Sequence, residues 1–177
     1  MRATAVVLAA LIPLALAGCN KADKGPKTLE QAKAEAKQLE RPDPGKYKQV
    51  TKITKFDVPG APPQVAEQMK KMMEGQGHET TYCLTKADSE KGFEEMFKKV
   101  AEGECKYDRF DATSGSIDAI MTCQAKDQGT MRLAMNGTVS PRGSHVKVDV
   151  QQTGAKNMPG NATIAMDVAS ERLGDCT

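Results

Sequence analysis

Four successive segments in the second half of the chain alternate apolar and polar residues, and this pattern constrains the fold more than any other feature. Antiparallel strands that pack one face on a core and expose the other face to water have this period of two. Turn residues such as Ser140-Pro141-Arg142-Gly143 separate the segments. We therefore predict an antiparallel meander. The apolar positions are Ile117, Ala119, Met121 and Cys123; Met131, Leu133, Met135 and Val139; Val146, Val148 and Val150; and Ile164, Met166 and Val168.

The preceding part of the chain adds strands and two helices. Residues 46–58 are rich in β-branched and aromatic residues and predict a strand, whose lysines favour a sheet edge. A shorter strand is expected at residues 78–84. Apolar residues at helical spacing predict a helix near residues 65–73 and a second helix that follows a capping-box variant at residues 85–88 and includes Phe93 to Val100. Gly92 lies early in this second helix and is a candidate break in it. The expected fold class is α+β: an antiparallel β-sheet meander of about six to seven strands, with two helices inserted near the start and two disulfides.

Four cysteines follow the N-terminal region, and their even number predicts two disulfides in an exported chain. A hairpin loop at residues 113–115 places Ala112 opposite Ser116, and this register brings two of the cysteines face to face. Phe110 falls on the opposite face from Tyr107, which indicates a β-bulge. A zinc site is the alternative, although zinc ligands usually come in close pairs. The predicted disulfides are Cys105 with Cys123 and Cys83 with Cys176.

The N-terminus has the pattern of a bacterial lipoprotein signal. Arg2 precedes an apolar stretch of about fifteen residues, which is too short to span a bilayer. The stretch ends in Leu16-Ala17-Gly18-Cys19, which matches every position of a lipobox. We expect cleavage of residues 1–18 and lipid attachment to Cys19, with acyl chains that anchor the protein. Asn20 favours the outer membrane, because Asp at this position retains lipoproteins at the inner membrane of enteric bacteria. An ordinary signal peptide with a chance cysteine is the alternative.

Residues 19–44 predict a polar tether that leads to a disulfide-stapled domain at residues 45–177. Thr28 and Gln31 form a capping box at the start of a helix. The apolar stripe of this helix is mostly alanine, which buries little area. We therefore expect a solvated helix or a partly disordered spacer, which two prolines end.

Seven short segments of the chain form a recognisable set. They are Pro44-Gly45-Lys46-Tyr47, Tyr82-Cys83-Leu84-Thr85, Gly92-Phe93-Glu94-Glu95-Met96, Ile117-Asp118-Ala119, Met121-Thr122-Cys123, Gly129-Thr130-Met131 and Arg172-Leu173-Gly174-Asp175-Cys176. Together they resemble the domain-of-unknown-function 3617 family of small exported proteobacterial proteins. The resemblance covers roughly Pro42 to Cys176, and the cysteine frame and the Gly-Asp-Cys ending are its most specific parts. Many members have Trp where this chain has Tyr47. Because the family has no established activity, the resemblance implies architecture and export and no particular chemistry.

No group of residues in the sequence indicates catalysis, a cofactor or a metal centre. The histidines, His78 and His145, belong to different strands and are expected at the surface. On the second helix, glutamates and lysines at i,i+4 spacing are expected to pair on the solvated face. Methionines fit core stripes, while a Cu(I) site made of thioethers is the alternative. The methionines concerned are Met69, Met72, Met131 and Met135.

These patterns favour a non-enzymatic binding or interaction module of the cell envelope. We expect a protein that faces the periplasm from a lipid anchor on Cys19, with the outer membrane favoured over the inner one. Its expected partner is an envelope protein or a small apolar ligand bound on the apolar face of the sheet. A formal net charge of +2 without a basic stripe does not suggest nucleic acid. The alternatives are a structural or stress-related lipoprotein without a small ligand, and a methionine-based metal binder.

Overall fold

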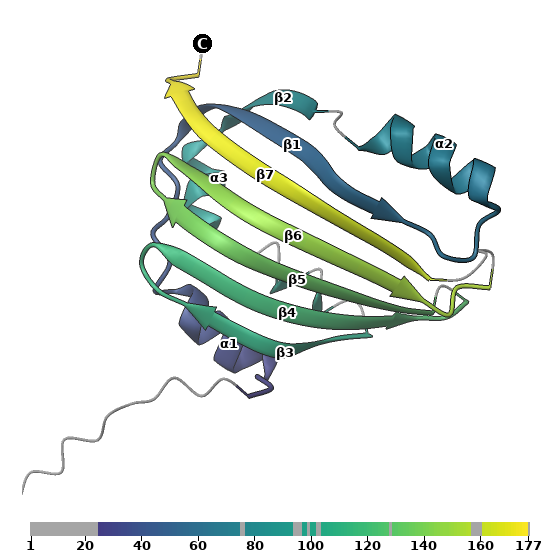
Figure 1. Cartoon of the computed structure of the whole chain (residues 1–177). Helices are drawn as coiled ribbons and strands as arrows, with labels where there is room; N and C mark the ends of the chain where they lie inside the picture. Colours follow the sequence, from purple (N-terminus) through teal and green to yellow (C-terminus); the bar gives the residue numbers. More distant parts are fainter. Residues whose placement is uncertain are drawn as a thin grey trace, which may run out of the picture.

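Seven antiparallel strands form one twisted sheet in the order β2-β1-β7-β6-β5-β4-β3 (Figure 1). The structure is a computed structural model that describes residues 25–74, 77–93, 97–98, 100–101, 104–127, 129–156 and 161–176. The predicted α+β fold is confirmed, with α2 and α3 inserted on either side of β2. The elements are α1 (Leu29–Ala36), β1 (Gly45–Asp57), α2 (Pro63–Met73), β2 (Gly77–Leu84), α3 (Lys86–Lys91), β3 (Glu104–Ala112), β4 (Ser116–Ala125), β5 (Gly129–Ser140), β6 (Gly143–Thr153) and β7 (Ala162–Gly174).

The alternating residues of β4 to β7 all lie on one side of the sheet, called the apolar face below. The pairing register places Ala119, Met135, Val148 and Met166 side by side across four strands and continues to Ile53 on β1. A register shift of one residue would move a whole set to the other face. The hydrophobic pattern therefore specifies the pairing of the central strands.

The lysines of β1 lie on the opposite, polar face, and the prediction that β1 forms a sheet edge is wrong. β1 lies between β2 and β7. Lys48 Nζ lies 2.8 Å from a carboxylate oxygen of Glu79 on β2. Lys52 stands opposite Asp167 on β7. Both lysines lie beside acidic residues of neighbouring strands. Their charge therefore marks the solvent-exposed face of an inner strand and does not mark a sheet edge.

A β-bulge in β3 sets the geometry of the β3–β4 hairpin. The predicted pairing of Ala112 with Ser116 is wrong, because Ala112 stands opposite Ile117. The register then shifts between Tyr107 and Arg109, as the predicted bulge requires. The predicted register was wrong by one residue at the turn, and the bulge shifts the actual register by one residue. The two cysteines of the hairpin therefore lie directly opposite each other, as predicted. Beyond the bulge, the side chains of Phe110 and Tyr107 lie on the same face.

Both predicted disulfides are present. Cys105 and Cys123 join opposite positions of β3 and β4, with their Cα atoms 4.0 Å apart. Cys83 on β2 joins Cys176 after β7, with their Cα atoms 5.8 Å apart. The bridged cysteines are 18 and 93 residues apart in the sequence. In the chain-entropy model, loops of this size stabilise the fold by about 3 and almost 5 kcal/mol.

The helix α1 packs against the apolar face, so the expectation of a solvated spacer is wrong. Its capping box is confirmed, with the Gln31 N–H donating to Thr28 Oγ1 at 3.2 Å. Ala32 is fully buried and Leu39, just after the helix, is 4% exposed. The small alanine side chains allow the helix to approach β3 closely.

Two separate clusters cover the two ends of the apolar face. The larger contains α1, Phe97 and the inward residues of β3 and β4. In it, the ring centroids of Tyr107 and Phe110 are 5.2 Å apart, and Phe97 packs on both rings. The smaller cluster joins Phe56 of β1 and Ala162 of β7 to the end of α2. The core is therefore divided, and the middle of the sheet belongs to neither cluster in the described part of the chain.

Replacing Leu39 with Ala tests whether α1 and the residues after it belong to the core. We expect the free energy of unfolding to fall by about 2–5 kcal/mol, because a buried leucine leaves a cavity. The exposed neighbour Gln38 is the matched control. Gln38→Ala should change the free energy of unfolding by less than about 0.5 kcal/mol. Urea unfolding monitored by circular dichroism measures both variants. Equal effects of the two substitutions would contradict the packed position of this segment.

A second prediction concerns stability at alkaline pH. Burial raises the pKa of Tyr107 to about 12, and it also raises the pKa of the more exposed Tyr82. An unfolded tyrosine ionises near pH 10, roughly its model-peptide value. The contribution of Tyr107 to the unfolding free energy is therefore complete below pH 10 and is lost as the pH rises towards 12. Tyr107→Phe should flatten this loss more than Tyr82→Phe in urea unfolding across that range; an unchanged slope would be evidence against the burial of Tyr107.

Candidate functional site

The middle of the apolar face is only partly covered. Six apolar side chains there are half-buried, and within the described residues neither core cluster includes them. Hydrocarbon of this kind, left between two packed clusters, offers a surface on which an apolar molecule can bind. The six residues are Met131, Leu133, Val148, Val150, Met166 and Val168.

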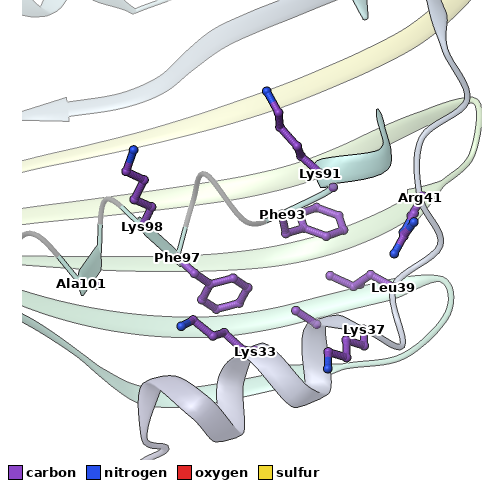
Figure 2. A pocket seen from close by; sticks show the side chains of 11 residues that line it. Lys33, Lys37, Leu39, Arg41, Lys91, Phe93, Phe97, Lys98 and Ala101 are labelled. Atoms are coloured by element: carbon purple, nitrogen blue, oxygen red, sulfur yellow. The ribbon is translucent and has the colours of Figure 1, made fainter. Parts of the chain in front are cut away.

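A cavity of about 610 Å³ lies between α1 and the chain that follows α3 (Figure 2). It is called the basic pocket below. Its volume falls within the range of roughly 300–1,000 Å³ that is usual for small-molecule sites. The lining residues are Lys33, Ala36, Lys37, Leu39, Arg41, Lys91, Gly92, Phe93, Phe97, Lys98 and Ala101.

The floor of the basic pocket is hydrocarbon that belongs to the core. Ala36, Leu39 and Phe97 are each less than a tenth exposed, and Phe93 is half-buried beside them. Figure 2 shows the rings of Phe93 and Phe97 lying between their own segment and α1. A ligand in the pocket would therefore contact aromatic and aliphatic carbon.

The rim of the basic pocket is cationic. Of the eleven lining residues that the structure describes, five carry a positive charge and none carries a carboxylate. Lys33 pairs with Glu30 at 3.0 Å and Lys91 with Asp88 at 3.3 Å, so part of this charge is compensated. Lys37 has no ion pair with any residue that the structure describes.

The direction of the side chains divides the cations into two groups. Lys33, Lys37 and Arg41 line the pocket from the α1 side, while the amino groups of Lys91 and Lys98 point away from α1 (Figure 2). Arg41 is also without an ion pair among the described residues. The ion pairs predicted for the glutamates of the second helix lie outside the described residues. Lys33, Lys37 and Arg41 therefore form the α1 side of the cationic rim.

Local hydrogen bonds fix the segment that carries Arg41. The Glu40 N–H donates to the Ser114 carbonyl at 3.2 Å. On the other side, the buried hydroxyl of Ser89 on α3 donates to the Pro42 carbonyl at 2.6 Å. The loop at Ser114 and the helix α3 thus hold the chain between α1 and β1 in place. The backbone of Arg41 is therefore fixed independently of its side chain.

The break at Gly92 opens the other wall of the pocket. Thr85 caps α3 by accepting from the Asp88 N–H at 3.1 Å, and the helix ends at Lys91. Gly92 has φ of +55°, which favours glycine, and turns the chain before Phe93. The predicted break is confirmed. After it, the rings of Phe93 and Phe97 point towards α1 (Figure 2).

The methionine prediction is partly wrong. Met69 and Met72 on α2 are 40% and 60% exposed, so they form no core stripe. Met131 and Met135 are half-buried on the apolar face. The stripe on α2 stays exposed because the helix contacts β1 mainly through its last turn, where Met73 packs on the smaller cluster.

The histidines are both exposed, as predicted, and His145 Nε2 lies 3.9 Å from Asp167 Oδ1 on the polar face. Among the described residues, no three His, Cys, Asp or Glu side chains gather closely enough to hold a metal ion. None of the helices in the described ranges has the length and apolar composition of a membrane span. Cys19 and the signal sequence lie outside these ranges.

The sequence reasoning identified the apolar face but missed the basic pocket. The available signal was the spacing of Lys33, Lys37 and Arg41 beside a stripe of alanines. On a helix that was expected to be solvated, such lysines predict only an exposed charged side. The pocket exists because two segments that are distant in the sequence meet.

Comparison with known proteins places the chain in a family. No curated protein and no solved structure is detectably similar to it. A family model described as "Protein of unknown function (DUF3617)" matches residues 42–176. The match spans well over half of the chain, as the resemblance in the cysteine frame had implied. The chain therefore belongs to the DUF3617 family of proteins of unknown function.

Proposed function

We propose that this protein is a lipid-anchored, non-enzymatic binding module of the cell envelope that holds a small apolar ligand. The observation that carries the proposal is the basic pocket, a cavity of about 610 Å³ whose floor is buried hydrocarbon. Small-molecule sites are typically concave and apolar, with a few polar groups that orient the ligand.

The composition of the pocket supports binding and gives no support to catalysis. The described lining side chains are lysine, arginine, alanine, leucine and phenylalanine, with one glycine. None of these described side chains supplies a hydroxyl, thiol, imidazole or carboxylate for nucleophilic or acid–base chemistry.

The lipobox supports the proposed location, facing the periplasm with the outer membrane favoured. Lys27 is fixed to the sheet, because its N–H donates to the Tyr107 carbonyl at 3.0 Å. Cys19 precedes Lys27 by eight residues, and a chain of that length spans at most about 29 Å. A lipid on Cys19 would thus keep α1 and the basic pocket within a short distance of the membrane surface.

A second candidate function is an envelope interaction module without a small ligand. The exposed stripe of α2 favours it. Val65, Met69 and Met72 recur on one side of this helix and are 46%, 40% and 60% exposed. An amphipathic helix with such a stripe can bind in the groove of a partner protein.

Filling the pocket tests the first function. Ala101 lines the pocket and is exposed, so Ala101→Trp should occupy the cavity without disturbing the core. We expect the affinity for N-phenylnaphthylamine, an uncharged apolar fluorophore, to fall by at least about tenfold, or about 1.4 kcal/mol. Ala34→Trp, on the exposed side of α1 and outside the pocket, is the matched control. Fluorescence titration measures both, and equal affinities of the two variants would reject the pocket as the ligand site.

Lipid attachment is tested at Cys19. Cys19→Ala should abolish incorporation of labelled fatty acid and change the processing of the precursor, because no thiol remains at the cleavage site for the diacylglyceryl group. Metabolic labelling followed by electrophoresis measures both effects. Label that persists on the variant would place the lipid elsewhere and remove the basis for the proposed anchor.

A further inference from the structure

We infer that the ligand of the basic pocket is an anionic amphiphile, an alkyl chain that ends in a carboxylate or a phosphate. The inference rests on the proposed function and adds the chemical class of the ligand. Its alkyl chain lies against the hydrocarbon floor. Its headgroup binds at the α1 side of the rim, to Lys37 and Arg41.

The first argument is the segregation of charge. The whole chain is nearly balanced, with 25 basic and 23 acidic residues. Among the described residues that line the basic pocket, five are basic and none is acidic. Like charges gathered on one rim repel each other, and a bound anion relieves that repulsion most where the surroundings are partly desolvated. A neutral apolar ligand would leave this arrangement unexplained.

The second argument is the position of the charges relative to the floor. Lys37 and Arg41 are exposed, whereas Leu39 between them in the sequence is buried in the floor. Figure 2 shows the three residues together at one end of the pocket, with the Phe93 ring beside them. An amphiphile has the same arrangement, with a charged end next to hydrocarbon. The pocket therefore matches both parts of such a molecule at once.

The third argument is the availability of the two cations. Neither Lys37 nor Arg41 forms an ion pair with another described residue, whereas Lys33 and Lys91 do. A guanidinium presents paired donors that fit a carboxylate or a phosphate, and a lysine adds a mobile point charge. The hydrogen bonds of Glu40 and Pro42 on either side hold the backbone of Arg41 in place. The headgroup site thus stands on a fixed segment.

A purely structural role accounts for only part of this arrangement. Lys37 is the C-terminal cap residue of α1, where a positive charge is favourable because of the helix dipole. This explains one lysine on one helix. It does not explain why Arg41, beyond the helix, and Lys98, on the opposite wall, line the same cavity.

Three ligands with the same alkyl chain test the inference. Dodecanoate, dodecyl phosphate and dodecanol differ only in their polar end, and all are used below their aggregation concentrations. Isothermal calorimetry with the mature protein, together with displacement of N-phenylnaphthylamine, measures each affinity. We expect at least one of the two anions to bind about tenfold or more tightly than dodecanol, because hydrogen bonds to charged groups are worth more than neutral ones. The better anion identifies the headgroup.

Two double variants locate the headgroup. Lys37→Gln with Arg41→Gln should abolish the preference for the anion and leave the affinities for dodecanol and the fluorophore unchanged. The matched control is Lys52→Gln with Lys147→Gln, which removes the same charge from exposed positions on the polar face. The control should keep the full preference.

The outcomes separate the inference from the function on which it rests. If dodecanol binds as tightly as both anions while Ala101→Trp still abolishes binding, the inference is wrong and the proposed function stands. If none of the alkyl ligands and no fluorophore binds, both are wrong. If the preference for the anion survives in the Lys37 and Arg41 double variant, the headgroup does not bind where we place it.

Discussion

The β-bulge between Tyr107 and Arg109 determines how one edge of the sheet is covered. By adding a residue to β3 it brings Phe110 to the same face as Tyr107, and the two rings then pack edge to face with centroids 5.2 Å apart. Phe97 packs on both rings, and the buried alanines of α1 join the same cluster. The chain has no tryptophan and few aromatics, so three of them gathered at one site supply much of its core volume. Without the bulge, Phe110 would lie on the polar face, and the cluster that holds α1 would lose one of its three rings.

This single cluster also makes the basic pocket possible. Phe97 holds the segment after α3 over the sheet, and Ala36 and Leu39 hold α1 and the residues that follow it. The two segments pack on the same aromatic cluster and carry lysines and an arginine on the rim of the cavity between them. A divided core thus leaves a cavity beside its larger cluster and uncovered hydrocarbon in the middle of the sheet. Both features follow from a chain that is too poor in large apolar residues to cover the whole apolar face.

Local patterns predicted the sheet well, because alternation and turn residues act over a few positions. The pairing of Cys105 with Cys123 was predicted from the hairpin, although the turn register was wrong by one residue and the bulge compensated for it. The role of α1 could not be predicted in the same way. Alanine buries little area on its own, and Ala32 is fully buried only because the distant Phe97 and Phe110 meet it. The basic pocket needs two distant segments to meet, and no pattern within either of them indicates a cavity.

The basic pocket beside α1 and the exposed stripe of α2 lie near opposite edges of the sheet. This separation bears on whether both can be occupied at once. α1 packs at β3, on one edge of the sheet, and α2 packs at β1, near the other edge (Figure 1). Five steps between neighbouring strands separate β3 from β1, or about 24 Å at the usual spacing. The proposed lipid on Cys19 connects directly to the α1 edge. In that arrangement the basic pocket lies on the membrane side, where an anionic amphiphile from the bilayer can reach Lys37 and Arg41. The stripe of α2 lies towards the periplasm, where it remains accessible to a soluble partner, so the pocket and the stripe can be occupied at the same time.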